Sequence, residues 1–146
     1  MLKLRKLKKD DIEALMKILG ENDDPSILEA QKYYIECLNT KSPQKHNFVI
    51  EFDNKLIGTI GYKKTDNNHT ITWFHVQTEF QGRGLGSKAL EIIEEAIAPK
   101  KATKIIVNTG YKTAINFYEK NGYKNIKTTK NFYPSGHDQT TLEKEF

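Results

Sequence analysis

The chain has 146 residues, of which 37% are hydrophobic and 29% charged, and its formal charge is +4. This length predicts one domain, residues 1–146, with a composition typical of a folded globular protein. The single cysteine, Cys37, excludes an internal disulfide, and the four scattered histidines show no zinc-binding spacing, so we expect no metal and a reducing cytoplasm. The positive charge comes without an RNA-binding aromatic motif, and no apolar stretch suits a signal peptide. We therefore expect no nucleic-acid and no membrane partner.

The first part of the chain predicts a strand followed by two helices. Residues 1–7 alternate apolar with basic side chains, which is the pattern of a strand. Asp10 then has the side chain of a helix cap, and the apolar stripe behind it ends at Gly20. A turn at residues 22–25 places a proline where a second helix can begin, and that helix runs to about Asn39.

Three strands are predicted next. Residues 48–51 and 56–62 are rich in β-forming side chains and are joined by Asp53-Asn54, a short hairpin signal. A second turn at residues 66–68 leads into a third strand at residues 70–76. Because the connections are short, these strands should be antiparallel.

A glycine-rich loop follows the third strand, with the sequence Gln81-Gly82-Arg83-Gly84-Leu85-Gly86. Its three glycines allow positive φ angles and let the backbone approach a ligand closely. The apolar spacing after Gly84 predicts a helix, whose first turn points unpaired N–H groups and the positive end of its dipole towards the loop. Arg83 adds a full positive charge, so the loop is suited to a pyrophosphate.

Two other phosphate-binding motifs compete with this interpretation. A Walker loop needs Gly-Lys-Ser/Thr, whereas the order here is Gly86-Ser87-Lys88. The dinucleotide fingerprint is formally satisfied by residues 84–89, but the next strand, residues 104–107, ends in Asn108-Thr109-Gly110 without the expected carboxylate. The antiparallel strands before the loop also argue against that fold.

Two motifs carry a resemblance to a known family. The pattern Gln81-x-x-Gly84-x-Gly86, after a strand ending in Val76, resembles the acetyl-CoA pyrophosphate loop of the GNAT N-acetyltransferases. The segment at residues 114–123 is similar to the family's later helix, in which an alanine and a tyrosine lie near the cofactor. One departure is Tyr111, at a position where the family often has asparagine.

The resemblance implies an α/β (α+β) fold, with a mixed, mostly antiparallel sheet of about six or seven strands flanked by about four helices, the last strands being residues 123–132 and 138–146. It also implies direct acetyl transfer from acetyl-CoA to the primary amine of a small molecule or peptide, and it allows a homodimer. A non-catalytic acyl-CoA sensor of the same fold and a dinucleotide-binding protein are the alternatives.

The resemblance also supplies a set of candidate site residues. Tyr118 is the candidate acid for the departing thiolate, and the backbone N–H of Val76 is the candidate donor to the developing oxyanion. We assign no general base, because Glu51 and Glu79 are as well explained as surface carboxylates. The residues expected at the cofactor are Phe74, His75, Val76, Gln81, Gly82, Arg83, Gly84, Leu85, Gly86, Ser87 and Tyr111.

Overall fold

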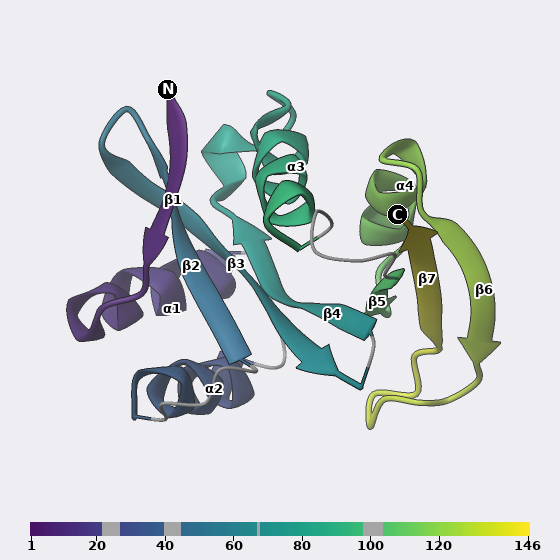
Figure 1. Ribbon diagram of the computed structural model, residues 1–146. Helices are drawn as coiled ribbons and strands as arrows, with labels where there is room; N and C mark the ends of the chain where they lie inside the picture. Colours follow the sequence, from purple (N-terminus) through teal and green to yellow (C-terminus); the bar gives the residue numbers. More distant parts are fainter. Residues whose placement is uncertain (22–26, 40–44, 67, 98–103) are drawn as a thin grey trace.

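The computed structural model shows a seven-stranded sheet with helices on both faces (Figure 1). It describes residues 1–21, 27–39, 45–66, 68–97 and 104–146. In chain order the elements are β1 (Leu2–Lys6), the 3-10 turn η1 (Lys9–Asp11), α1 (Ile12–Glu21), α2 (Ile27–Asn39), β2 (Lys45–Phe52), β3 (Lys55–Thr65), β4 (Asn68–Val76), the 3-10 turn η2 (Thr78–Phe80), α3 (Leu85–Ile97), β5 (Lys104–Thr109), α4 (Lys112–Lys120), β6 (Lys124–Thr129) and β7 (Gln139–Glu145).

The sheet has the strand order β1-β2-β3-β4-β5-β7-β6. Its only parallel pair, within the described residues, is β4 with β5, and all other neighbours are antiparallel. This arrangement confirms the expected mixed, mostly antiparallel sheet with four α-helices. The predicted turn at residues 22–25 lies outside the described residues.

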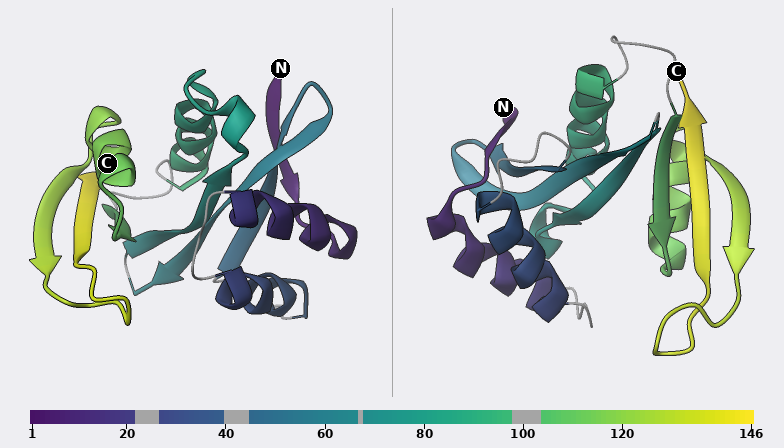
Figure 2. Two further views of the ribbon diagram at one scale, coloured as in Figure 1. Left: turned by 180° about the vertical axis from the view of Figure 1, so that it is seen from behind. Right: turned by 60° about the horizontal axis from the view of Figure 1, so that its bottom comes forward.

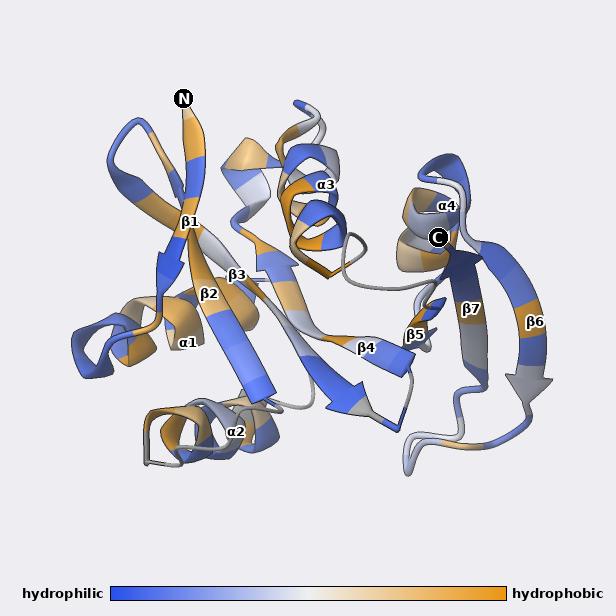
Figure 3. Cartoon of the chain, in the orientation of Figure 1, coloured by the Kyte–Doolittle hydropathy of each residue, from blue (hydrophilic) through white to orange (hydrophobic). Residues whose placement is uncertain are grey.

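The helices divide between the two faces of the sheet. Helices α1 and α2 cover one face, whereas α3 and α4 lie on the other (Figure 2). One buried cluster joins α3 and α4 to the sheet and includes Ile60, Leu90 and Ile105; the other joins α1 and α2 to it and includes Leu15 and Tyr34. The apolar residues accordingly gather on the central strands and the inner sides of the helices, whereas the outer strand β6 is largely hydrophilic (Figure 3).

The β2–β3 hairpin shows how local chemistry fixes this part of the fold. Asp53 and Asn54 have φ angles of 49° and 65°, which are the left-handed conformations of a two-residue turn. The predicted hairpin is therefore confirmed. At the other end of the chain, β6 ends at Thr129, earlier than predicted, because Asn131 adopts a φ of 51° and its N–H donates to the Asp138 carboxylate at 3.1 Å.

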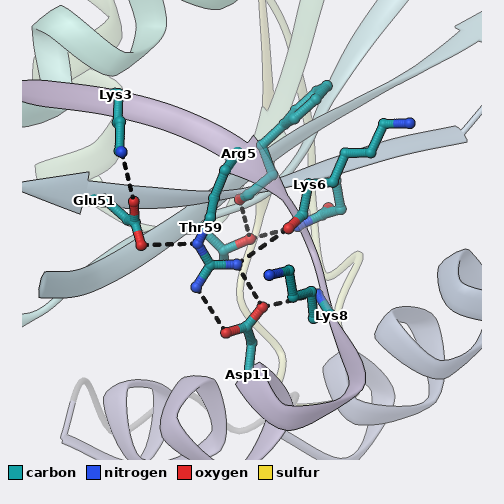
Figure 4. A network of polar contacts seen from close by, with 9 residues as sticks. Lys3, Arg5, Lys6, Lys8, Asp11, Glu51 and Thr59 are labelled. Carbon is teal, nitrogen blue, oxygen red and sulfur yellow. Dashed lines mark hydrogen bonds and ion pairs between the residues drawn. The ribbon is translucent and has the colours of Figure 1, made fainter. Parts of the chain in front are cut away.

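The start of α1 differs from the sequence prediction. Asp11, not Asp10, closes the preceding turn, since its carboxylate accepts the backbone N–H of Lys8 at 2.8 Å. The same carboxylate is held by both terminal nitrogens of Arg5, each at 2.8 Å, and the Arg5 Nε donates to Glu51 at 2.8 Å (Figure 4). These contacts favour Asp11 over Asp10. The predicted end at Gly20 is also one residue short, as α1 runs to Glu21.

Candidate active site

The site is organised by an irregularity in β4. Its register against β3 shifts between Thr59 and Gly61, so that two residues of β4, Trp73 and Phe74, face a single residue of β3. Trp73 has a φ of 44°, a strained value for a bulky side chain. Gly58 of β3 allows the backbones of β3 and β4 to approach closely beside the bulge, because a Cβ at position 58 would lie 2.0 Å from the carbonyl oxygen of His75.

Beyond its first residues, β4 separates from β5. The two strands pair only through Asn68, His69 and Thr70, opposite residues 104–106. Residues 71–76 of β4 therefore have an edge towards β5 that carries no ladder hydrogen bonds. Figure 1 shows the two strands diverging in the middle of the sheet, with α3 following one and α4 the other.

Val76 lies at the end of this open edge. Gln77 donates its N–H to the Ile57 carbonyl at 2.7 Å, which makes Ile57 and Gln77 a hydrogen-bonded pair. In antiparallel sheets such pairs alternate with residues whose N–H and C=O point the other way, so the Val76 N–H points away from β3, into the opening. The Gln81 side chain donates to the Val76 carbonyl at 2.8 Å on that side. Val76 thus presents the N–H that an oxyanion would need.

The glycine loop connects η2 to α3. Gly82 and Gly84 both have a φ of 77°, and a Cβ at either position would meet no atom within 4 Å, so the loop surface is open. The first helical hydrogen bond runs from Lys88 to Gly84 at 3.1 Å, which leaves the N–H groups of residues 85–87 without helical acceptors. Such a loop and helix start fit a phosphate or pyrophosphate.

One member of the loop differs from the prediction. Gly86 does not adopt a positive φ, and a Cβ there would make ordinary van der Waals contact with the Phe117 ring at 3.4 Å. The Arg83 side chain is exposed, and its guanidinium lies 5.3 Å from the centre of the Phe80 ring. The loop therefore carries its positive charge beside the open backbone.

Tyr118 is buried, with 5% of its surface exposed. Its ring packs against those of Phe74, Phe117 and Tyr123 at centroid distances of 6.4, 5.2 and 5.4 Å. No hydrogen bond holds its hydroxyl to another described residue. Burial raises the pKa of Tyr118, so the phenol stays protonated at neutral pH and can donate a hydrogen bond.

The outer side of α4 carries a shallow, open depression that was not anticipated from the sequence. It is lined by Thr113, Asn116, Phe117, Glu119 and Lys120. Ala114 and Tyr118 lie on the side of α4 that packs against the buried cluster, with the Tyr118 ring beside Phe74 of β4. Phe117 lies against Phe74 and close to Gly86. The i, i+3, i+4 spacing of the residues that line the depression was the available signal.

The remaining candidates lie around the opening without forming one cluster. Phe74 faces α4, whereas His75 is on the other face of β4, with its ring 6.2 Å from that of Trp73. Tyr111 is half exposed at the start of α4, where its carbonyl accepts from Ile115 at 3.0 Å. Glu51 is not a suitable base, because Arg5, followed by Lys3, lowers its pKa.

Within the described ranges, no group of three or more His, Cys, Asp or Glu residues could hold a metal ion, and each helix is too short or too polar to cross a bilayer.

Residues 12–123 match the model of the Acetyltransferase (GNAT) family. The chain belongs to the GNAT family of acetyltransferases. No curated protein matched its sequence. The solved structures that share its fold include the following three. A protein assigned to the GNAT family from Desulfovibrio desulfuricans has a TM-score of 0.86 at 20% identity, covering 99% of each chain. The Salmonella typhimurium acetyltransferase that modifies the N-terminal serine of ribosomal protein L7/L12 has a TM-score of 0.84 at 16% identity, covering 99% of this chain and 95% of its own. The PaiA N-acetyltransferase of Thermoplasma acidophilum, in complex with coenzyme A, has a TM-score of 0.78 at 20% identity, covering 100% of this chain and 99% of its own.

Proposed function

We propose that residues 1–146 act as one catalytic unit that transfers the acetyl group of acetyl-CoA to the primary amine of a small molecule or peptide. The observation that carries this proposal is the opening between β4 and β5, which has Val76 and the glycine loop beside it. The Tyr118 ring packs against Phe74, on the part of β4 that is not paired with β5. The coenzyme A complex of the related Thermoplasma acidophilum protein supports the choice of acyl donor.

Each part of the site has a distinct task. The N–H groups at the start of α3 and the open loop around Gly82 and Gly84 suit the pyrophosphate, with Arg83 adding charge. Acetyl-CoA supplies the acetyl group as a thioester. The Val76 N–H would stabilise the oxyanion that forms when the amine attacks, because it is already oriented before the reaction.

Tyr118 would act when the thiolate leaves. A coenzyme A thiol should have a pKa near 8.5, by analogy with cysteine, so complete proton transfer from a phenol whose pKa is raised above about 10 is uphill. The hydroxyl therefore acts mainly by donating a hydrogen bond to the developing thiolate. This assignment agrees with a hydroxyl that no other described residue holds.

The amine must lose a proton before it attacks. An alkyl ammonium of pKa about 10.4 is neutral in roughly one molecule in 2,500 at pH 7, a cost of about 4.6 kcal/mol. Glu51 is tied to Arg5 and is a poor acceptor for that proton. Either a base other than Glu51 or a dehydrated pocket that favours the neutral amine would have to assist this step.

Thermal unfolding with ligands tests the donor. Acetyl-CoA at a hundredfold excess over its Kd should stabilise the protein by about 2.7 kcal/mol, because it binds only the folded state. A shift with NAD and none with acetyl-CoA would contradict the proposal in favour of dinucleotide binding.

An amine panel tests the reaction, with release of free coenzyme A as the readout. The panel should include a peptide with an N-terminal serine, since the related Salmonella typhimurium enzyme modifies one. Binding of acetyl-CoA without turnover on any amine would indicate a sensor of the same fold.

A further inference from the structure

The turn after α4 has an unusually well-defined geometry. Tyr123 donates its N–H to the Tyr118 carbonyl at 3.0 Å, and Gly122 donates to Glu119 at 3.1 Å, with Gly122 at a φ of 92°. These are the two hydrogen bonds of a Schellman motif, which ends a helix sharply. Asn121 is the last residue before the glycine, and its backbone N–H also bonds the Tyr118 carbonyl, at 3.0 Å.

The side chain of Asn121 connects the two helices of the candidate site. Its Nδ2 donates to the Ser87 hydroxyl at 3.2 Å and to the Phe117 carbonyl at 2.8 Å. An amide has two N–H groups, so both bonds can exist together. Ser87 is in the first turn of α3, beside the glycine loop, and Phe117 directly precedes Tyr118 on α4.

A second polar link joins the same turn to α3. The Tyr123 hydroxyl donates to the Glu94 carboxylate at 2.9 Å, and Lys144 bonds both Glu94, at 3.2 Å, and the Asn121 carbonyl, at 3.0 Å. Ser87 and Glu94 are about two helical turns apart, so α3 is attached at two heights. These bonds lie across the opening in which the β4–β5 ladder has ended at Thr70.

We propose that Asn121 is a positioning residue for acetyl transfer, because its amide sets the separation between the glycine loop and the Tyr118 hydroxyl. The inference rests on the proposed function. The loop would hold the donor's phosphates, and Tyr118 its sulfur, so the spacing of α3 and α4 decides whether one bound molecule reaches both. A misplacement of about 1 Å in such a site can cost about a hundredfold in rate.

The test compares Asn121→Ala with the wild-type full chain. We expect the Kd for coenzyme A, measured by calorimetry, to rise by about two- to tenfold, the loss expected for one or two neutral hydrogen bonds. We expect kcat, measured with an amine from the panel, to fall by about tenfold or more, since Tyr118 is displaced as well. Asn121 has a φ of −94°, which alanine adopts without strain, so the protein should fold.

Two further variants separate positioning from folding. Asn121→Leu fills the volume of the amide without donating a hydrogen bond, and it should show the same losses as alanine. Thr141→Val is the matched control, because it removes a 2.7 Å bond to Asn108 that joins β7 to β5 on one side of the opening. It should leave Kd and kcat unchanged.

The outcomes are distinguishable. If both Asn121 variants lower Tm while Kd and kcat per folded molecule match the wild type, the residue is only a helix cap, and the inference is wrong. If the wild type itself fails to bind coenzyme A, the proposed function is wrong, and this inference with it. If the two Asn121 variants lose affinity for coenzyme A and the Thr141→Val variant does not, the result supports the positioning role of Asn121.

Discussion

The glycine loop and the surroundings of Tyr118 are built in opposite ways. Around Gly82 and Gly84 the backbone is open, and a Cβ would meet nothing within 4 Å. Tyr118, by contrast, is enclosed by the rings of Phe74, Phe117 and Tyr123. Under the proposed function, binding in the first region would depend on the absence of side chains, whereas chemistry in the second would depend on the hydroxyl of one ring that its neighbours hold in place. The two regions should therefore respond to different mutations.

The largest effect is expected in the loop. Gly84→Val should abolish acetyl-CoA binding, because a branched side chain would obstruct the phosphates and resist the positive φ. Calorimetry on the purified variant measures this loss. The strain itself should cost about 1–2 kcal/mol of folding stability.

Two controls make the Gly84 result specific. Gly136→Val introduces the same kind of strain, since Gly136 has a φ of 87° and an equally open position in the β6–β7 turn, but it should bind acetyl-CoA normally. Arg83→Ala keeps the loop backbone and should weaken binding less than Gly84→Val. Normal binding by the Gly84 variant would mean that the glycines only shape the turn.

An intermediate effect, on turnover but not on binding, is expected for Tyr118→Phe. This change keeps the ring and its packing, so kcat should fall by roughly ten- to a thousandfold with little change in acetyl-CoA affinity. Because burial raises the pKa of the phenol above the ordinary tyrosine value of about 10, the hydroxyl stays protonated at neutral and mildly alkaline pH, and the ratio of wild-type to variant kcat should be constant up to about pH 10. An unchanged kcat, with chemistry limiting the rate, would assign Tyr118 to the core alone.

The smallest effect on activity is expected outside both regions. Asp11→Asn weakens the paired bonds from Arg5 and should reduce the free energy of unfolding at pH 7 by about 1–3 kcal/mol while leaving kcat unchanged. Arg5 lowers the pKa of Asp11, so this contribution is complete above the ordinary aspartate pKa of about 3.9 and is lost as the pH falls through the lower folded value.

Urea unfolding measures the Asp11 effect, and the difference between wild type and variant should shrink at about pH 3. Asp10→Asn is the matched control, since Asp10 is exposed and should tolerate the change. Equal losses for the two variants would contradict the role of the Arg5 network.

Elements governed by local chemistry were predictable from the sequence. The Asp53-Asn54 turn and the positive φ angles of Gly82 and Gly84 follow from what those residues tolerate. The choice of Asp11 over Asp10 was not predictable, because the Asp11 carboxylate is held by the guanidinium of Arg5, which also bonds Glu51 of β2. A strand side chain outside the turn thus decided between two adjacent aspartates.

The geometry of the candidate site was predictable where its proposed role lies in the backbone. The glycine pattern and the strand ending in Val76 were visible in the sequence. The bulge at Trp73 was not predicted, since it depends on how β3 accommodates β4, although glycine at position 58 within a strand was a signal. The Asn121 bridge depends on the spacing of α3 and α4, which no single segment encodes.

The divergence of β4 and β5 has a consequence for the exchange of amide hydrogens with solvent. Along residues 71–76, amides that face β3 are held in a ladder, whereas that of Val76 faces the opening. The Val76 amide should therefore exchange deuterium far faster than that of Gln77, its bonded neighbour, in the ligand-free protein. Bound acetyl-CoA should slow exchange at the Val76 amide and leave exchange at the Gln77 amide nearly unchanged. The two adjacent amides would therefore report separately on ligand occupancy and on the integrity of the sheet.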